Sequence, residues 1–355
     1  MAVLAALTEM GMDYSNAKYH VSGTNEDLRK NNGDPITYLG PHSRRSLMPR
    51  TAYGNSDDYN LAGQIPFYEQ VDRDAGIIWV HFLGDGHSIT SDDDKNNGLV
   101  EIRDTTGRMV FGISRHWYYS TTQWYTEFNI TTHNDSGSRA TTQLAASNTS
   151  GRIHSDIALD FVNNTATLYL NGAKVAVKNC DLNRATKNPL AEARIYAMRF
   201  YDSESAISEL IITQGEPTIG WRLATLAPDS LGTINTFASG DHSSINEVNF
   251  NPNTYLETDS TATATFTYTD LPSSPEHVVR GVTIKTTATS DIGGNTIVED
   301  IIRVGGVVHT IGSTDFETSE FTKDSNRLVE KNPDTGEDWL ESEVNSAQFG
   351  VNVRS

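Results

Sequence analysis

The chain has 355 residues with 46 acidic and 27 basic side chains, so its formal net charge is −19. Its length predicts two domains at roughly 150 residues each, and its negative charge repels nucleic-acid phosphates and anionic lipids, which excludes nucleic-acid binding. The absence of an apolar run of about 18 residues excludes membrane insertion, and the lone Cys180 cannot form an intrachain disulfide, so we expect folding in a reducing cytoplasm.

Residues 1 to 60 show neither the period of a strand nor that of a helix. Their apolar start, Met1 to Leu7, is too short for a signal peptide and lacks its basic first residues. Turn-forming residues follow at 31–35 and 41–45. We therefore predict an extended N-terminal arm, either loosely held or wrapped around a neighbouring subunit.

Residues 61 to 227 consist of short apolar runs bounded by Gly, Asn and Asp, as is typical of β-strands. The pattern predicts a buried strand over 76–84 and a hairpin over 99–113. It is clearest over 153–177, where alternating apolar residues flank turns at Asn163-Asn164 and Asn171-Gly172. Since Asn and Gly tolerate the positive φ of tight hairpin turns, this stretch predicts three antiparallel strands.

Residues 228 to 355 are rich in Thr, Ser and Asp, and they hold 20 of the acidic but only 7 of the basic residues. Strict alternation over 261–268 places one set of side chains on the same face of a strand: Ala262, Ala264, Phe266 and Tyr268. Further strands are predicted over 277–287, 296–311 and 347–353, with a turn at Pro333–Gly336 and a short helix from Glu341. Long amphipathic helices are missing throughout, so we predict an all-β protein with a second, smaller β-sandwich.

The segments Asp156–Phe161, Ala166–Val175 and Ile207–Thr213 resemble the closing strands of concanavalin A-like, laminin-G-like jelly rolls. That family pairs a strand with a Leu-Tyr-x-Asn-Gly hairpin and returns through a Ser-Glu-hydrophobic strand. The resemblance covers roughly residues 65 to 225 and implies a lectin-like jelly roll over 61–227. Since this fold occurs in lectins, glycanases and adhesion modules, it does not decide among these functions.

The segments Asn332–Trp339 and Glu343–Val351 are similar to the ends of tailed-bacteriophage virion proteins that follow a concanavalin-like domain. This resemblance implies a structural protein of the virion, made in the host cytoplasm, in the tail or its fibres. A capsid decoration protein is the near alternative. The resemblance further implies a homo-oligomer that binds other virion proteins, with host surface glycans as a further partner.

The sequence lacks the carboxylate motif of glycanases with this fold. That motif, Glu-x-Asp-x-x-Glu, places two Glu on one strand face, where one attacks the sugar and the other protonates the leaving oxygen. Its nearest counterpart, Glu317 and Glu320, has a three-residue spacing that puts them on opposite faces. We therefore predict a protein that is not an enzyme, with a carbohydrate-active enzyme that degrades host polysaccharide as the alternative.

Asp92, Asp93 and Asp94 cluster the hard oxygen ligands that calcium prefers, and they are the candidate metal ligands. The EF-hand spacing fails because Asn97 stands where that loop needs glycine. The alternative is a polar loop that its aspartates keep soluble, and no other cofactor is expected. His81 lies within an apolar strand, where a hydrogen-bonded core histidine is commoner than a metal ligand.

Six aromatic residues lie between 117 and 128, the densest such cluster in the chain. Five of them are candidates for carbohydrate or subunit contact: Trp117, Tyr118, Tyr119, Trp124 and Tyr125. Aromatic rings stack on sugar faces and anchor protein interfaces, although they also fill sandwich cores. Because adjacent strand residues point to opposite faces, the core cannot bury them all, and at least one ring is expected to be exposed.

Overall fold

The computed structural model describes residues 2–7, 30–31, 34–35, 60–84, 87–88, 100–120, 123–147, 153–197, 199–200, 203–204, 207–224, 226–245, 254–271, 278–290, 296–316 and 322–354. These residues form an all-β protein, as predicted. The chain divides into two compact units, Met1–Leu223 and Ala224–Ser355, where the sequence analysis had placed the boundary at 227/228. In the described part, no helix has the length and hydropathy of a membrane span.

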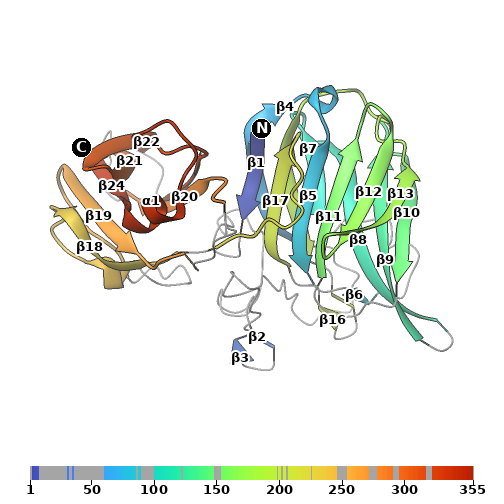
Figure 1. Cartoon of the computed structure of the whole chain (residues 1–355), viewed down its shortest axis with the longest axis horizontal. Helices are drawn as coiled ribbons and strands as arrows, with labels where there is room; N and C mark the ends of the chain where they lie inside the picture. Colours follow the sequence, from blue (N-terminus) through green and yellow to red (C-terminus); the bar gives the residue numbers. More distant parts are fainter. Residues whose placement is uncertain are drawn as a thin grey trace. The chain divides into compact units, whose positions relative to one another are not determined.

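The first unit is a jelly-roll sandwich of two sheets, antiparallel except for the short strand β6, which lie face to face in Figure 1. Sheet I contains, in spatial order, β1 (Ala2–Leu7), β17 (Ile207–Gln214), β5 (Ile78–Gly84), β11 (Ile153–Asp160), β12 (Thr165–Leu170) and β13 (Ala173–Asn179). Sheet II contains β10 (Arg139–Ser147), β9 (Gln123–His133), β8 (Met109–Ser120), β7 (Val100–Asp104), β14 (Leu190–Ala197) and β4 (Asn60–Val71), and β6 (His87–Ser88) pairs with β8. Two short pairs lie outside these sheets: β2 (Lys30–Asn31) with β3 (Asp34–Pro35), and β15 (Arg199–Phe200) with β16 (Ser203–Glu204).

Apolar residues at every second position of the strands form the core between the two sheets. Phe82 and Ile157 of sheet I and Phe111 and Phe128 of sheet II are fully buried in one apolar cluster. The turns predicted around β12 are also present, since Asn164 and Asn171 adopt positive φ values of 52° and 49°. The local pattern therefore specifies the three-stranded segment β11–β12–β13.

The N-terminus differs from the extended arm predicted for residues 1–60. Residues 2 to 7 form β1, which pairs antiparallel with β17 at the edge of sheet I. Leu4 is fully buried in the sandwich core, because the apolar start of the chain supplies a strand that covers the open edge. Most of the remaining predicted arm lies outside the described residues.

The second unit is a smaller β-sandwich. Its main sheet contains, in spatial order, β18 (Pro228–Asn235), β19 (Ala262–Tyr268), β24 (Gln348–Arg354), β21 (Thr296–Val304) and β22 (Val307–Phe316). The pair β20 (Val282–Thr289) and β23 (Thr322–Val329) supplies the other layer, and α1 (Glu341–Ser346) is the predicted helix. The core between the layers includes Ile302, Trp339 and Phe349. The predicted face of β19 is confirmed, since Ala262, Ala264 and Phe266 are buried and Tyr268 packs edge-on against Phe349.

Cys180 lies in the core of the first unit and offers a probe of its folding. Burial raises the pKa of the Cys180 thiol, so little of it is the reactive thiolate near neutral pH. We expect iodoacetamide at pH 8 to leave Cys180 unmodified in the native protein and to alkylate it once the protein is unfolded in urea. Mass spectrometry of the Cys180 peptide measures the difference, and rapid alkylation without denaturant would contradict the buried position.

Candidate functional site

The outer face of sheet II, opposite the core, carries an unusual concentration of polar side chains. Inward residues such as Ile102, Phe111 and Ile130 are fully buried apolar groups, and their neighbours along each strand therefore point outward. We call the following set the polar face: Glu101, Arg103, Ser114, Glu127, Asn129, Thr131, Glu192 and Arg194.

The strand register aligns these residues into rows across the sheet. In one row, Arg194 lies opposite Glu101, which lies opposite Gly112. The row continues through Thr131 to Thr141, and the two threonine hydroxyls are 3.1 Å apart. Gly112 adds no side chain to the middle of the row, and it is buried there.

Two ion pairs lie on the polar face, each formed along one strand. Arg103 Nη2 donates to Glu101 Oε2 at 2.8 Å on β7. Arg194 Nε donates to Glu192 Oε1 at 2.7 Å on β14. Residues two apart on a strand share a face, so each glutamate can hold its arginine in place. The glutamate also partly neutralises the positive charge of that arginine.

Ser114 and Asn129 occupy the centre of the polar face directly opposite each other on β8 and β9. Both side chains are almost completely buried, yet Ser114 Oγ and Asn129 Nδ2 have no hydrogen-bond partner in the described part of the molecule. A buried polar group without a partner costs about 1–3 kcal/mol. A buried group of this kind calls for an explanation, and a catalytic role or a bound water or ion is one.

The five predicted aromatic residues all lie on the end of the β8–β9 hairpin. We call this segment, Trp117–Tyr119 with Trp124–Tyr125, the aromatic tip. Its pairs, Tyr118 with Tyr125 and Tyr119 with Trp124, lie beyond the last residues of β9 that pair with β10, so the hairpin projects past its neighbours (Figure 1). By strand alternation, Tyr118 and Tyr125 continue the polar face, whereas the other three continue the core face. The structure describes only the backbone of these residues.

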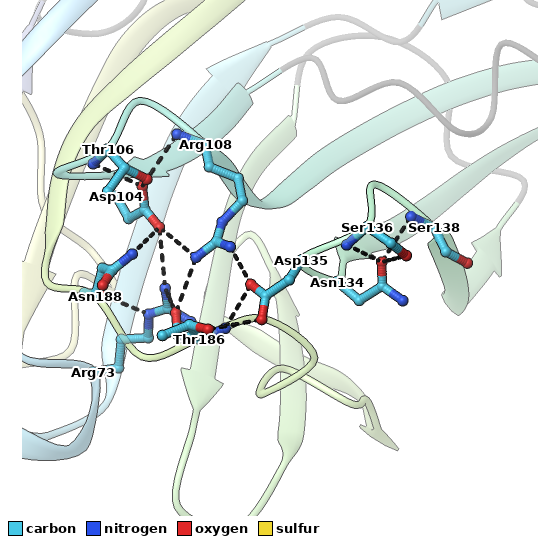
Figure 2. Close-up of polar contacts among 10 residues, drawn as sticks. All are labelled: Arg73, Asp104, Thr106, Arg108, Asn134, Asp135, Ser136, Ser138, Thr186 and Asn188. Carbon is cyan, nitrogen blue, oxygen red and sulfur yellow. Dashed lines mark hydrogen bonds and ion pairs between the residues drawn. The ribbon is translucent and has the colours of Figure 1, made fainter.

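A network of charges ties together the loops at the opposite end of sheet II (Figure 2). Asp104 Oδ1 accepts hydrogen bonds from the Thr106 hydroxyl at 2.6 Å and the Thr106 amide at 2.9 Å, and Oδ2 accepts from Arg108 Nη2 at 2.9 Å. Burial acts to raise the pKa of Asp104, but hydrogen bonds from Thr106, Asn188 and Arg108 outweigh it and lower the pKa to about 2. Arg73 is buried beside this carboxylate and donates to the Asn188 and Thr186 carbonyls. Since all these groups bond within the protein, we assign the network a structural role.

A second buried polar cluster lies on the outer face of sheet I. His81 Nδ1 and Thr218 Oγ1 both lie 2.8 Å from Asp156 Oδ1, and the three side chains are almost fully buried. His154 stacks on His81 with ring centroids 5.6 Å apart. The hydrogen-bonded core histidine predicted at position 81 is therefore confirmed.

The structure does not test the predicted calcium ligands, because Asp92, Asp93 and Asp94 lie outside the described residues. Within the described ranges, no group of three or more His, Cys, Asp or Glu side chains is arranged to hold a metal ion.

The polar face escaped the sequence analysis, although a signal for it exists. Glu-x-Arg occurs at 101–103 and again at 192–194, each time with an apolar residue between the charges. This spacing places opposite charges together on one strand face, away from the core. The sequence did not indicate that the two strands are neighbours in sheet II.

No protein-family model and no curated protein matches this chain. Solved structures that match it include an alginate lyase from Pseudomonas aeruginosa, at 10% identity over 50% of this chain and 88% of that chain, with a TM-score of 0.33. A pentraxin from Limulus polyphemus matches at 12% identity over 45% and 70%, with a TM-score of 0.28. A Trypanosoma rangeli sialidase matches at 10% identity over 51% and 30%, with a TM-score of 0.29.

These matches correct the prediction that the protein is not an enzyme. Several of the matching structures are polysaccharide lyases, so the absence of one glycanase motif does not exclude catalysis. They leave the virion assignment untested, and it stays a prediction.

Proposed function

We propose that the chain is a virion component of a tailed bacteriophage whose first unit binds a carbohydrate through the polar face and the aromatic tip. The observation that carries the binding proposal is that the polar face and positions 118 and 125 of the aromatic tip lie on one continuous face of β8 and β9. Buried side chains with hydrogen-bonding groups, Ser114 and Asn129, lie on the same outer strand face as Tyr118 and Tyr125. Carbohydrate sites combine such polar groups with aromatic rings that stack on sugar faces.

The virion part of the proposal rests on the similarity of Asn332–Trp339 and Glu343–Val351 to the ends of phage virion proteins. We propose a homo-oligomer attached to the tail or its fibres, with capsid decoration as the alternative. Immunogold labelling of purified particles, read by electron microscopy, separates the two locations. Failure of the antibody to label any particle would overturn the virion assignment.

Substitution of Tyr125 by alanine is expected to weaken carbohydrate binding by about twofold to tenfold, since an aromatic contact contributes about 0.5–1.5 kcal/mol beyond burial. Isothermal titration against oligosaccharides released from the host surface measures the effect. Tyr255 is 57% exposed in the second unit, so Tyr255→Ala is the matched control and should bind normally. No binding by the wild type, or equal losses in both variants, would contradict the proposal.

The same incubations separate binding from degradation. We would follow the chain length of the host polysaccharide by size-exclusion chromatography after prolonged contact with the protein. Unchanged length with measurable affinity indicates a binding function. Shortened chains indicate a polysaccharide-degrading enzyme that uses the same face.

A further inference from the structure

The polar face holds five charged side chains, and four of them form the two ion pairs described above. The fifth is Glu127 on β9, which is only 7% exposed. Its carboxylate forms no hydrogen bond and no ion pair within the part of the chain that the structure describes. Glu127 therefore brings a negative charge to this face that no described side chain neutralises.

Two further side chains with unused hydrogen-bonding groups lie next to Glu127. Asn129 is two residues further along β9 on the same face, at about 7 Å between the two Cα atoms. Ser114 lies directly opposite Asn129 on β8. Among the described residues, Asn129 Nδ2 and Ser114 Oγ have no hydrogen-bond partner, and both side chains are almost completely buried. We call Ser114, Glu127 and Asn129 the polar triad.

The polar triad does not have the bonding of a structural network. A buried carboxylate that lacks partners disfavours the folded protein, because the charge loses its hydration without compensation. In the same unit, the buried carboxylate of Asp104 accepts hydrogen bonds from three different side chains. The contrast between Glu127 and Asp104 favours a binding role for the polar triad over a role in folding.

The chemistry of the polar triad matches the hydroxyl groups of a sugar. A carboxylate only accepts hydrogen bonds, an amide nitrogen only donates them, and a serine hydroxyl does both. A sugar hydroxyl also does both, so neighbouring hydroxyls of one ring satisfy all three groups. A metal ion prefers a site lined by oxygen atoms, and the donor Nδ2 of Asn129 opposes it.

The charge of the polar triad disfavours an acidic sugar, because a second anion beside Glu127 is repelled. The basic side chains described on this face do not offset the repulsion. Its two ion-paired arginines are each held by a glutamate. Arg139 lies opposite His133, six residues from Glu127 along β9, or about 20 Å at the rise of an antiparallel strand.

We propose that the polar triad binds neighbouring hydroxyl groups of a neutral sugar and excludes sugars that carry carboxylate, sulfate or phosphate groups. This inference rests on the proposed carbohydrate function and names the ligand as a neutral glycan. Glu127 accepts hydrogen bonds from the sugar, and Asn129 and Ser114 donate to it. Position 125 of the aromatic tip is two residues from Glu127 on the same face of β9, so one glycan reaches both.

The test separates oligosaccharides released from the host surface into neutral and acidic fractions by anion exchange, and it titrates each fraction by calorimetry. We expect the neutral fraction to bind at least about tenfold more tightly. Glu127→Gln keeps the shape of the side chain but removes its charge, so it should weaken this binding by about tenfold or more. Glu257 is exposed in the second unit, and Glu257→Gln is the matched control that should bind normally.

Thermal unfolding distinguishes a binding role of Glu127 from a structural one. Because its carboxylate is buried without a partner in the described ranges, Glu127→Gln should unfold at the temperature of the wild type or above it. A lower unfolding temperature would assign Glu127 to the stability of the fold and overturn the inference.

The remaining outcomes separate this inference from the proposed function. Equal or tighter binding of the acidic fraction would overturn the neutral-sugar assignment while carbohydrate binding stands. Titration with calcium chloride alone tests a cation as the occupant, and binding heat that disappears in Glu127→Gln would also overturn the assignment. No binding of either fraction would overturn the proposed carbohydrate function itself.

Discussion

Replacement of Asp104 by alanine is expected to lower the free energy of unfolding of the first unit by about 3–5 kcal/mol, because it leaves a buried charge without its partner. Arg73 is only 1% exposed, and its Nη2 lies 3.8 Å from Asp104 Oδ2. The carboxylate also joins the hairpin after β7 to Asn188 in the loop before β14. Urea denaturation followed by circular dichroism measures the loss.

The control for this prediction is an exposed ion pair in the same region. Lys187 and Asp74 are 2.8 Å apart and about half exposed, so Lys187→Ala should cost less than about 1 kcal/mol. Equal effects of the two substitutions would show that the burial of Asp104 does not matter.

The contribution of Asp104 should also depend on pH. Its pKa is about 2 in the folded protein against an ordinary value of 3.8, a difference equivalent to about 2 kcal/mol. Because the folded-state pKa is the lower one, the stabilisation is complete above pH 4 and is lost as the pH falls from about 4 to about 2. We expect the stability difference between wild type and Asp104→Asn to shrink by that amount over this interval.

Replacement of Trp339 by alanine is expected to destabilise the second unit by about 3–5 kcal/mol. Its side chain is 2% exposed in a cluster with Val344 and Phe349, and its Nε1 donates to the Val329 carbonyl at 3.0 Å. Hydrogen exchange should lose protection along β21, β23 and β24. Trp339 therefore stabilises the core of the second unit independently of any binding partner.

Trp339→Phe separates the two contributions of this side chain. Phenylalanine keeps most of the apolar contact but removes the donor to Val329, so we expect a smaller loss of about 1–2 kcal/mol. A loss below 1 kcal/mol in Trp339→Ala would contradict the buried position of the indole.

The segment before Trp339, which resembles the ends of phage virion proteins, forms a turn in the structure. The predicted turn is present: Gly336 has a φ of +74°, and its amide donates to the Asn332 carbonyl at 2.8 Å. The Asn332 amide in turn donates to the Glu337 carbonyl at 2.9 Å. These residues close a turn that positions Trp339 against the core, so their spacing reflects a folding requirement of this unit.

The sequence predicted the candidate site only in part. It indicated the five aromatic residues of the tip, because they lie close together in the chain on one hairpin, and their role as a binding site stays a prediction. It missed the polar face, whose charged pairs Glu101–Arg103 and Glu192–Arg194 lie about 90 residues apart in the chain and meet only through the pairing of β7 with β14. Local periodicity carries no information on such pairings.

By itself, the sequence determined the strands and the turns, since both depend on interactions between residues that are close in the chain. Alternation fixed which side of β19 is apolar, and Asn164 and Asn171 permitted the positive φ of the hairpin turns. Only the tertiary structure decided that β1 joins β17, some 200 residues away, and that Ser114 and Asn129 are buried at the centre of an outer face. These residues become neighbours because the assembled sandwich buries the apolar faces of its strands. The free energy of that burial depends on the positions of all the strands together.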